Sequence, residues 1–299
     1  MVLMTEERMT SLLVPLDGSL PAARPLEVAQ AIAELRGDDI DILFVSPEPL
    51  AAGEVAEVVG LPVEWLPRVT LLNTVGDPGE GICRVAGEIK ADAIFMSTHG
   101  RTRDLTSLVG SVTLKVLRDP PCPVLVCRSA LDCGSQARRL RHLRRLCIPL
   151  DGSPEAAWSV RVGSALAQQA NARILMLHVI DDRPRKKGRA LAEPSYSDQP
   201  LYELEAWQEE FIRGSFAMVH RPREATTSFV LRFGDPDREV SHFAAETDCD
   251  LIVAAWGGSI YAGRAKVVQM LLEQAPCPLL FVPAAELPPS AWITPAARR

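Results

Sequence analysis

The sequence predicts two α/β domains in tandem, each a doubly wound parallel sheet of five strands with helices on both faces. Three observations support this prediction. The length of 299 residues fits two domains at roughly 150 residues each. Several segments of the first half recur in the same order in the second half. Within each half, short apolar runs alternate with stretches of helical periodicity, which is typical of buried strands joined by crossover helices.

The repeated segments occur at similar offsets along the chain. Residues 12–19 read L-L-V-P-L-D-G-S and residues 146–153 read L-C-I-P-L-D-G-S, an offset of 134. Later matches are G-D-P at 76–78 and 234–236, D-A-I and D-L-I at 92–94 and 250–252, and P-C-P at 121–123 and 276–278. Their larger offsets predict an insertion in the second copy. We place it in the polar stretch from 181 to about 204 and expect a solvated loop there.

Each element of the first copy is predicted from its own pattern. The apolar run Leu12–Leu16 precedes the turn residues Asp17 and Gly18, and so predicts a buried strand. Pro21–Leu35 has apolar residues at helical spacing and stops before Gly37, a common helix end. Further strands are predicted at Ile40–Val45, Leu71–Val75, Ala93–Met96 and Val124–Val126, with helices near Gly79–Ile89 and Ser111–Leu117.

The repeat also sets the predicted domain boundaries. The first domain spans residues 10–128 and the second spans 144–284. Residues 129–143 form a basic linker, and residues 285–299 form a tail that we expect to be irregular. We interpret the linker as a solvated helical connector rather than a nucleic-acid site. The arginines in and beside it are Arg138, Arg139, Arg141, Arg144 and Arg145.

The composition argues against several classes of protein. A net charge of -6 argues against a general nucleic-acid coat. No apolar run approaches the roughly 18 residues that a membrane span needs, and residues 1–10 lack the apolar core of a secretory signal. Seven scattered cysteines without a C-x-x-C pair favour neither a zinc site nor a disulfide framework. We therefore expect a cytoplasmic protein with reduced thiols and with no membrane or nucleic-acid partner.

Two segments of the first domain are expected to form a ligand site. In open parallel sheets, ligands bind beyond the carboxyl ends of the strands, where the strand order reverses. Pro15, Leu16 and Asp17 end the first predicted strand, and the loop Met96–Thr102 leaves the fourth. We expect these segments to meet in that crevice.

The second of these segments has the features of an anion site. Gly100 and Gly110 would let backbone N–H groups approach an anion closely. Ser111 is expected to serve as a helix N-cap and as a hydroxyl donor to phosphate. The helix N-terminus adds N–H groups and about half a unit of positive charge, and Arg101 adds more. Asp17 cannot bind phosphate directly, so we assign it to a ribose hydroxyl, an exocyclic amine or a metal ion.

The G-x9-G-S pattern is a weak signal alone, but its surroundings resemble a known family. The chain is similar to the universal stress protein family over about residues 10–128 and 144–284. The residues that carry the resemblance are V-P-L-D-G-S at 14–19, G-D-P at 76–78, S-T-H-G-R-T at 97–102, V-G-S-V at 109–112 and P-C-P-V-L-V at 121–126. Nucleotide-binding members of the family show G-x2-G-x9-G followed by Ser or Thr. Ser97 stands at the first glycine position, a departure that adds a Cβ and restricts φ.

This resemblance implies an adenine nucleotide alpha hydrolase-like fold and a stress-responsive regulator. Its N-terminal domain would bind ATP or AMP reversibly, with little or no hydrolysis and with Mg²⁺ accompanying the nucleotide. The resemblance also implies a homodimer, in addition to pairing of the two domains within the chain. The implied contacts with adenosine are Pro15, Leu16, Asp17 and Val45. The implied contacts with ribose and phosphates are Met96, Ser97, His99, Gly100, Arg101, Gly110, Ser111, Val112 and Thr113.

Two other readings of the function remain open. A scaffold of the same fold would bind no nucleotide, because Ser97 alters the loop. A slow ATPase or a nucleotidyl transferase would need an acid or base, for which His99 is the candidate. The sequence places no carboxylate or nucleophile beside His99, so we assign no catalytic residue and no metal ligand.

The second domain departs from the pattern of the first. The counterparts of Thr98, His99, Gly110 and Ser111 are Trp256, Gly257, Ala265 and Lys266. Asp151 is kept, and it is as consistent with a helix N-cap as with a ligand contact. We therefore expect the second domain to be degenerate, with its cleft filled by Trp256 or its neighbours.

The last strands of the two domains are expected to pair, as the resemblance implies. An open sheet edge favours unwanted association when it is left unpaired. We expect Val124–Val126 and Leu279–Val282 to lie close to a pseudo-two-fold axis.

Overall fold

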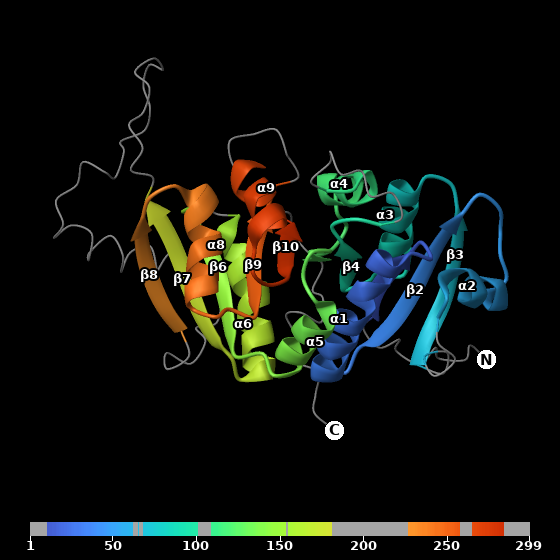
Figure 1. The fold of residues 1–299 in the computed structure, drawn as a ribbon, viewed down its shortest axis with the longest axis horizontal. Helices are drawn as coiled ribbons and strands as arrows, with labels where there is room; N and C mark the ends of the chain where they lie inside the picture. Colours follow the sequence, from blue (N-terminus) through green and yellow to red (C-terminus); the bar gives the residue numbers. More distant parts are fainter. Residues whose placement is uncertain are drawn as a thin grey trace, which may run out of the picture. The chain divides into compact units, whose positions relative to one another are not determined.

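The computed structural model describes residues 11–61, 65, 68–100, 109–153, 155–180, 227–257 and 265–283 (Figure 1). These residues fall into two compact units, one ending at His142 and the other beginning at Leu143. Arg101, the predicted insertion at 181–204 and the tail at 285–299 lie outside the described residues. No helix in the described ranges combines the length and the apolar character that a bilayer crossing requires.

The sheet of the first unit has the predicted doubly wound topology. Its strands lie in the order β3-β2-β1-β4-β5, and neighbouring strands run parallel. The order reverses between β1 and β4, so the carboxyl ends of these two strands border the crevice in which α/β proteins bind ligands. The strands are β1 (Ser11–Leu16), β2 (Asp39–Ser46), β3 (Val69–Val75), β4 (Ala93–Ser97) and β5 (Val124–Cys127).

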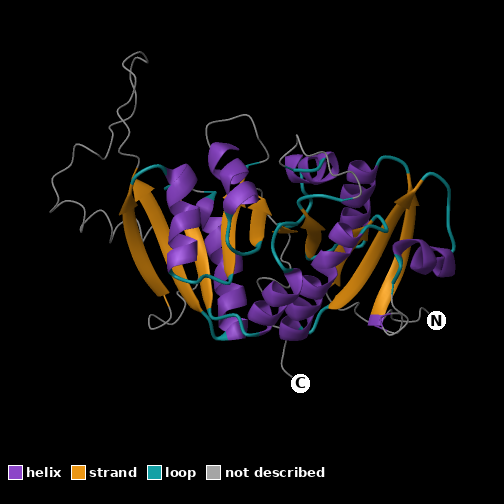
Figure 2. Ribbon diagram, viewed as in Figure 1, coloured by secondary structure: helices purple, strands orange, loops and turns teal. Residues whose placement is uncertain are grey.

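Two layers of helices accompany this sheet (Figure 2). One layer contains α1, which packs against β1, β2, β4 and β5 and against α5. The other contains α3, which packs against β2 and β3 and against α4. The helices are α1 (Leu20–Arg36), α2 (Ala52–Val59), α3 (Pro78–Glu88), α4 (Ser111–Arg118) and α5 (Cys133–Arg141). The predicted bounds of α1, α3 and α4 agree to within one residue, whereas α2 was not predicted.

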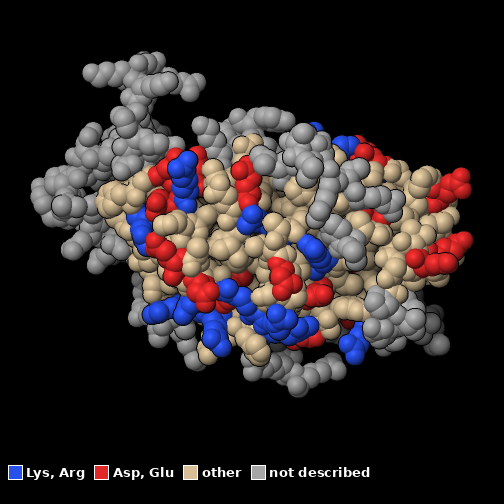
Figure 3. All heavy atoms as spheres, viewed as in Figure 1, with Lys and Arg blue, Asp and Glu red and all other residues tan. Residues whose placement is uncertain are grey.

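Helix α5 occupies the segment that the sequence predicts to be a solvated connector. The helix is confirmed, and Arg138 and Arg141 lie exposed on its outer side, where Figure 3 shows a group of basic side chains. Its inner side carries Ala137 and Leu140, which are buried, and the helix packs against α1. Arg141 also forms an ion pair with Glu34 of α1 at 2.9 Å. The expectation of solvation therefore holds for one side of the helix only.

The second unit repeats the topology of the first. Its strand order is β8-β7-β6-β9-β10, which is the first unit's order with each strand replaced by its counterpart. The strands are β6 (Arg145–Leu150), β7 (Arg173–Ile180), β8 (Thr227–Phe233), β9 (Leu251–Trp256) and β10 (Leu279–Pro283). Helix α6 (Ala156–Ala170) packs on the strands as α1 does, and α8 (Pro236–Glu246) packs against β7 and α9 (Ala265–Gln274).

A buried group of charges closes the amino end of the first sheet. Asp92 begins the turn into β4, and its N–H donates to the Ser11 carbonyl at 2.9 Å. Its carboxylate accepts from the Arg36 guanidinium at 2.9 Å, and the same guanidinium donates to Asp38 at 2.5 Å. All three side chains are at most 5% exposed. Because a buried charge needs partners to offset its desolvation, these contacts fix the end of α1 to the start of β4.

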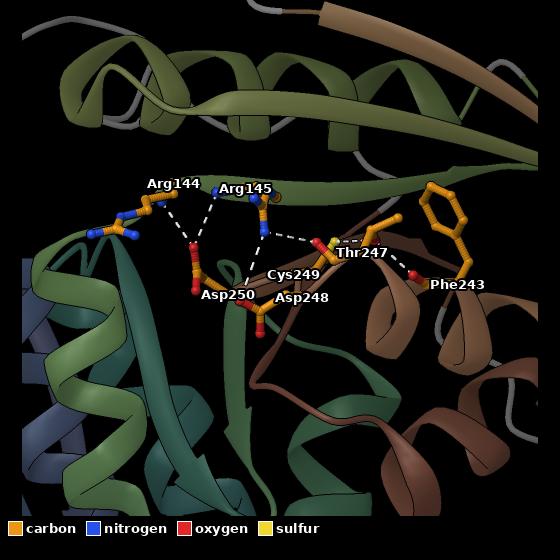
Figure 4. A network of polar contacts seen from close by, with 7 residues as sticks. All are labelled: Arg144, Arg145, Phe243, Thr247, Asp248, Cys249 and Asp250. Atoms are coloured by element: carbon orange, nitrogen blue, oxygen red, sulfur yellow. Dashed lines mark hydrogen bonds and ion pairs between the residues drawn. The ribbon is translucent and has the colours of Figure 1, made fainter.

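In the second unit the counterpart of Asp92 is Asp250, whose carboxylate binds backbone N–H groups instead of a buried guanidinium (Figure 4). The carboxylate of Asp250 accepts the backbone N–H groups of Arg144 and Arg145 at 2.9 and 3.1 Å. The half-exposed guanidinium of Arg145 donates to the Thr247 carbonyl at 3.1 Å and lies 3.7 Å from Asp248. Asp92 and Asp250 therefore occupy matching positions but bind different kinds of donor.

Candidate functional site

The tip of β1 and the loop after β4 are in contact, as the sequence predicts. Strands β1 and β4 pair directly, with Leu13 opposite Ile94. The Asp17 carboxylate accepts the Ser19 N–H at 2.9 Å, which fixes the turn after β1. Its other oxygen lies so close to Gly100 that a Cβ there would be 2.5 Å away. A side chain at Gly100 would therefore force the Asp17 carboxylate to shift, and because the φ of Gly100 is not positive, this contact rather than backbone conformation is what favours glycine.

Ser97, which replaces the family's first glycine, fits its position without backbone strain. It is the last residue of β4, is buried and pairs with Cys127 of β5. Its hydroxyl donates to the His99 carbonyl at 2.5 Å. The added side chain thus holds the loop after β4 instead of obstructing it.

A polar cluster beside this loop was only partly anticipated. The Thr98 hydroxyl accepts the Ser129 N–H at 3.0 Å and lies 2.8 Å from the Ser129 hydroxyl. His99 Nδ1 lies 3.1 Å from the Thr98 hydroxyl and 3.3 Å from that of Ser129. The Arg24 guanidinium of α1 in turn donates to the Ser129 carbonyl. Ser129 was predicted to lie in the linker, yet the adjacency of β4 and β5 places the residues after these two strands side by side.

Helix α4 begins directly beside the same loop. The Gly110 N–H donates to the Thr98 carbonyl at 2.7 Å, and the Thr113 hydroxyl donates to the Ser97 carbonyl at 2.9 Å. The N-cap of α4 is Gly110, so the prediction that Ser111 is the N-cap is wrong. A Cβ at Gly110 would meet the Thr98 carbonyl at 3.3 Å, which explains why glycine stands there. Ser111 is the first helical residue and its side chain is exposed.

The start of α4 differs from the starts of three other helices. Asp77, Asp132 and Asp235 are the N-caps of α3, α5 and α8, and each carboxylate accepts a first-turn N–H at 3.1 Å. Gly110 makes no side-chain cap bond. The first N–H groups of a helix have no partners within the helix, and they carry partial positive charge. The start of α4 therefore lacks the capping carboxylate that satisfies the other three.

An ion pair between neighbouring helices holds α4 in place. Lys115 of α4 lies 2.8 Å from Asp77 at the start of α3. This hydrogen bond lowers the pKa of Asp77 and raises the pKa of Lys115. Both side chains are about half exposed, so the pair contributes to orientation more than to stability.

The other predicted site residues differ in how far their side chains are buried. Val45, at the end of β2, packs on α3, where a Cβ on Gly81 would lie 3.4 Å from it. Buried side chains among the predicted contacts are those of Leu16 and Met96, and partly exposed ones are those of Pro15 and Val112. Arg101 lies outside the described residues, so the positive charge expected from it is not part of the geometry above.

The same region of the second unit is more apolar. Trp256, the counterpart of Thr98, is 4% exposed and packs edge-on against Phe281 of β10, with ring centroids 6.2 Å apart. Asp151 accepts the N–H and the hydroxyl of Ser153 at 3.0 and 2.5 Å. It is not the N-cap of α6, which is Glu155. Among the residues that the structure describes, none has an atom within 4 Å of a Cβ placed on Gly257.

A histidine also distinguishes the second unit. His178 pairs with Leu150 across β7 and β6, whereas Phe44 pairs with Leu16 at the matching place in the first unit. Burial lowers the pKa of His178, opposed in part by the hydrogen bond from its Nδ1 to the Leu150 carbonyl at 2.8 Å. The ring is therefore held in its neutral form more strongly than in water.

Comparison with known proteins agrees with the shared topology of the two units. The sequence profile of the universal stress protein family matches residues 61–128 and 142–283. The chain belongs to the universal stress protein family. A universal stress protein of Thermus aquaticus is 30% identical over 134 residues, which are 40% of this chain and 98% of that one.

Solved structures of similar length share the fold of this universal stress protein. One is a universal stress protein of Archaeoglobus fulgidus, with a TM-score of 0.63, 17% identity, and coverage of 92% of this chain and 98% of that one. Another is a functionally unknown protein of Pseudomonas aeruginosa, with a TM-score of 0.64, 14% identity and coverage of 92% of both chains. At these identities the likeness extends to the fold alone.

Proposed function

We propose that the first unit of this universal stress protein binds ATP or AMP reversibly at the carboxyl end of its sheet. The observation that carries the proposal is the start of α4, which lies beside the loop after β4 and begins at Gly110 without a capping carboxylate. An uncapped helix N-terminus binds anions, because its N–H groups point outward and its dipole favours negative charge. The phosphates of the nucleotide would take the place of the missing cap.

The neighbouring residues suit the rest of such a ligand. The Ser111 hydroxyl is exposed at the first helical position and can donate to a phosphate oxygen. Asp17 and Gly100 are in close contact, so an acceptor for ribose hydroxyls or the adenine amine lies next to the proposed phosphate site. Val45 and Pro15 are partly exposed apolar residues on the adjacent strands and would line the base pocket. Each of these roles is one that the family resemblance implies for the same residue.

The remaining features of the proposal concern how the nucleotide is used. Mg²⁺ would accompany the phosphates, and occupancy would regulate contacts with a partner or with a second copy of the chain during stress in the cytoplasm. We propose binding without turnover, since His99 is engaged with Thr98 and Ser129. The second unit would serve as a degenerate partner. The second unit carries buried Trp256 at the position of Thr98. Its helix α9 begins at Ala265, at the position of Gly110.

Titration calorimetry of the full chain with ATP and Mg²⁺ tests this proposal. The informative variant is Gly110→Asp, which would place a carboxylate where the phosphates are proposed to bind. We expect it to abolish the heat of binding and to change the stability of the first unit little, because the gain of roughly a few tenths of a kcal/mol from capping α4 is offset by the 3.3 Å contact of the new Cβ with the Thr98 carbonyl. Gly110→Ala is the matched control, since it adds the Cβ without the charge. Absence of heat from the wild-type protein at millimolar ATP would favour a scaffold that binds no nucleotide. Unchanged binding by Gly110→Asp would overturn the phosphate site at the start of α4.

A further inference from the structure

Two cysteines flank the turn that holds the candidate site loop. Cys127 is the last residue of β5 and Cys133 is the first residue of α5. The five residues between them reverse the chain, with the Leu131 N–H donating to the Arg128 carbonyl at 3.0 Å. Such a turn brings its flanking residues together. Both thiols are free and buried, and they face each other closely enough to form a hydrogen bond.

The two thiols of this pair differ in character. The hydrogen bond from Cys127 lowers the pKa of Cys133, and the positive charge of Arg24 acts in the same direction. Burial and the carboxylates of Glu27 and Asp132 oppose this shift. The pKa of Cys127 is raised by the same hydrogen bond and by its complete burial. Cys133 also stands at the first position of α5, where a helix N-terminus favours a thiolate, whereas Cys127 is fully buried, so Cys133 is the better nucleophile and Cys127 the thiol that retains its proton.

We propose that Cys127 and Cys133 form a peroxide-sensitive dithiol pair whose oxidation to a disulfide moves the loop after β4. The Cys133 thiolate attacks a hydroperoxide, the O–O bond breaks, and a sulfenic acid and one hydroxide or alkoxide form. Cys127 then attacks the sulfenic sulfur, and the departing hydroxide takes the Cys127 proton as water. With hydrogen peroxide, two thiols lose two electrons and one peroxide becomes two waters.

Because the two thiols flank a surface turn, peroxide can reach them although both are buried in the closed structure. Surface turns open locally at a much smaller free energy than the core. Because Cys127 and Cys133 are separated by five residues, they stay close together when that turn opens. A second pair of contacting thiols, Cys147 and Cys249, bridges the strand β6 and the residue before Asp250. These cysteines are 102 positions apart and would separate on opening, so the first pair should oxidise faster.

Formation of the disulfide would shift the candidate site through the contacts of Ser129. A disulfide holds its sulfurs about 2.05 Å apart, much closer than hydrogen-bonded thiols, so the turn between them must shift. Ser129 lies in that turn and contacts the hydroxyl of Thr98 and the ring of His99. We expect ATP affinity to fall at least about fivefold on oxidation, a typical size for coupling between sites. This last effect rests on the proposed function, whereas the disulfide and the loop movement do not.

Peptide mapping of the full chain after treatment with hydrogen peroxide tests the proposal. After trypsin digestion, Cys127 lies in the peptide 119–128 and Cys133 in the peptide 129–138. We expect these peptides to be joined, with the loss of two hydrogen atoms, and to separate on reduction. Cys122 shares the first peptide, so Cys122→Ser is the matched control and should keep the cross-link. Cys133→Ser should abolish it.

The loop movement is measured without nucleotide. In histidine-labelled protein, the ring resonances of His99 should shift between the reduced and oxidised states, while those of His242 in α8 should not. Free thiols at both positions under conditions that oxidise Cys83 would overturn the pair, and an unmoved His99 ring would overturn the coupling. Cross-linking together with the His99 shift, but without ATP binding in either state, would refute the proposed function and support this inference.

Discussion

The first unit holds the loop after its fourth strand with polar contacts. The Ser97 hydroxyl donates to the His99 carbonyl, and the Ser97 carbonyl accepts from the Thr113 hydroxyl of α4. The Thr98 hydroxyl accepts the Ser129 N–H. In the second unit the position of Thr98 carries Trp256, which is buried against Phe281. Two sheets of the same topology therefore differ at their switch points, the places where the strand order reverses. One places buried hydrogen-bonding groups there, and the other gains stability from apolar burial.

The opposite ends of the two sheets differ in another way. The first unit buries Arg36 between Asp38 and Asp92, so three charges depend on one another. In the second unit, Asp250 accepts backbone N–H groups and leaves Arg145 partly exposed. The first arrangement loses more when one member is removed, because an uncompensated charge remains buried.

The largest effect is expected from Trp256→Ala. Removal of this buried tryptophan should destabilise the second unit by about 3–5 kcal/mol. Thr98→Ala, at the matching position, removes hydrogen bonds and should cost the first unit about 1 kcal/mol. Urea denaturation, followed by tryptophan fluorescence and circular dichroism, measures both. Equal losses would show that the two switch points are built alike, contrary to the comparison above.

A second contrast compares Asp92→Ala with Asp250→Ala. Removal of Asp92 takes one of two carboxylates from the buried Arg36, and about 3 kcal/mol of stability should be lost. Removal of Asp250 leaves two backbone N–H groups without an acceptor and should cost about 1.5–3 kcal/mol. Denaturant midpoints of the two variants, referred to the wild-type protein, give the ranking. A larger loss for Asp250→Ala would contradict it.

A third contrast concerns nucleotide affinity. Gly100→Ala would place a methyl group against the Asp17 carboxylate, whereas the methyl group of Gly257→Ala would contact none of the described residues of the second unit. We expect the first variant to bind ATP at least about tenfold more weakly, equal to about 1.4 kcal/mol. The second should bind as the wild-type protein does. Calorimetric titration of both variants under the same conditions tests this, and a reversal of their order would place the site in the second unit.

The smallest effect is a pH dependence confined to the second unit. The pKa of His178 is lowered in the folded state by burial, so the unfolded chain binds its proton at a higher pH. Stability should therefore decline as the pH falls through the ordinary histidine value of about 6.5. His178→Phe introduces the residue type of Phe44 and should reduce the slope between pH 7 and pH 5. A slope that is unchanged in the variant would assign the dependence to other groups.

The fold was predictable from the sequence because its evidence is local and repeated. Each strand is a short apolar run, and the predicted bounds of the first unit's strands agree with the structure to within two residues. Helix α2 was missed because its eight residues are too few for a clear period, and Gly53 lowers its helical propensity. The repeat supplied the topology of the second unit, since matching segments in the same order imply the same strand order.

The candidate site was predictable only in part, because its details depend on contacts between distant segments. The segments that meet were foreseen from the rule for parallel sheets. The identity of the α4 N-cap was not, because serine is the stronger capping residue but the Thr98 carbonyl leaves little room for a side chain at Gly110. The contact of Arg24 with Ser129 joins residues 105 positions apart and leaves no sequence pattern.

Helix α5 has a practical consequence for dissecting this protein. A fragment that stops at residue 128, where the repeat and the family motif end, would lack α5 and expose the apolar side of α1 to water. Leu140 is fully buried, and its loss alone would remove about 1.5–3 kcal/mol of burial. A fragment that continues through His142 keeps this helix and the Arg141–Glu34 pair. The smallest autonomous piece of the first half should therefore extend beyond the last repeated segment, through α5.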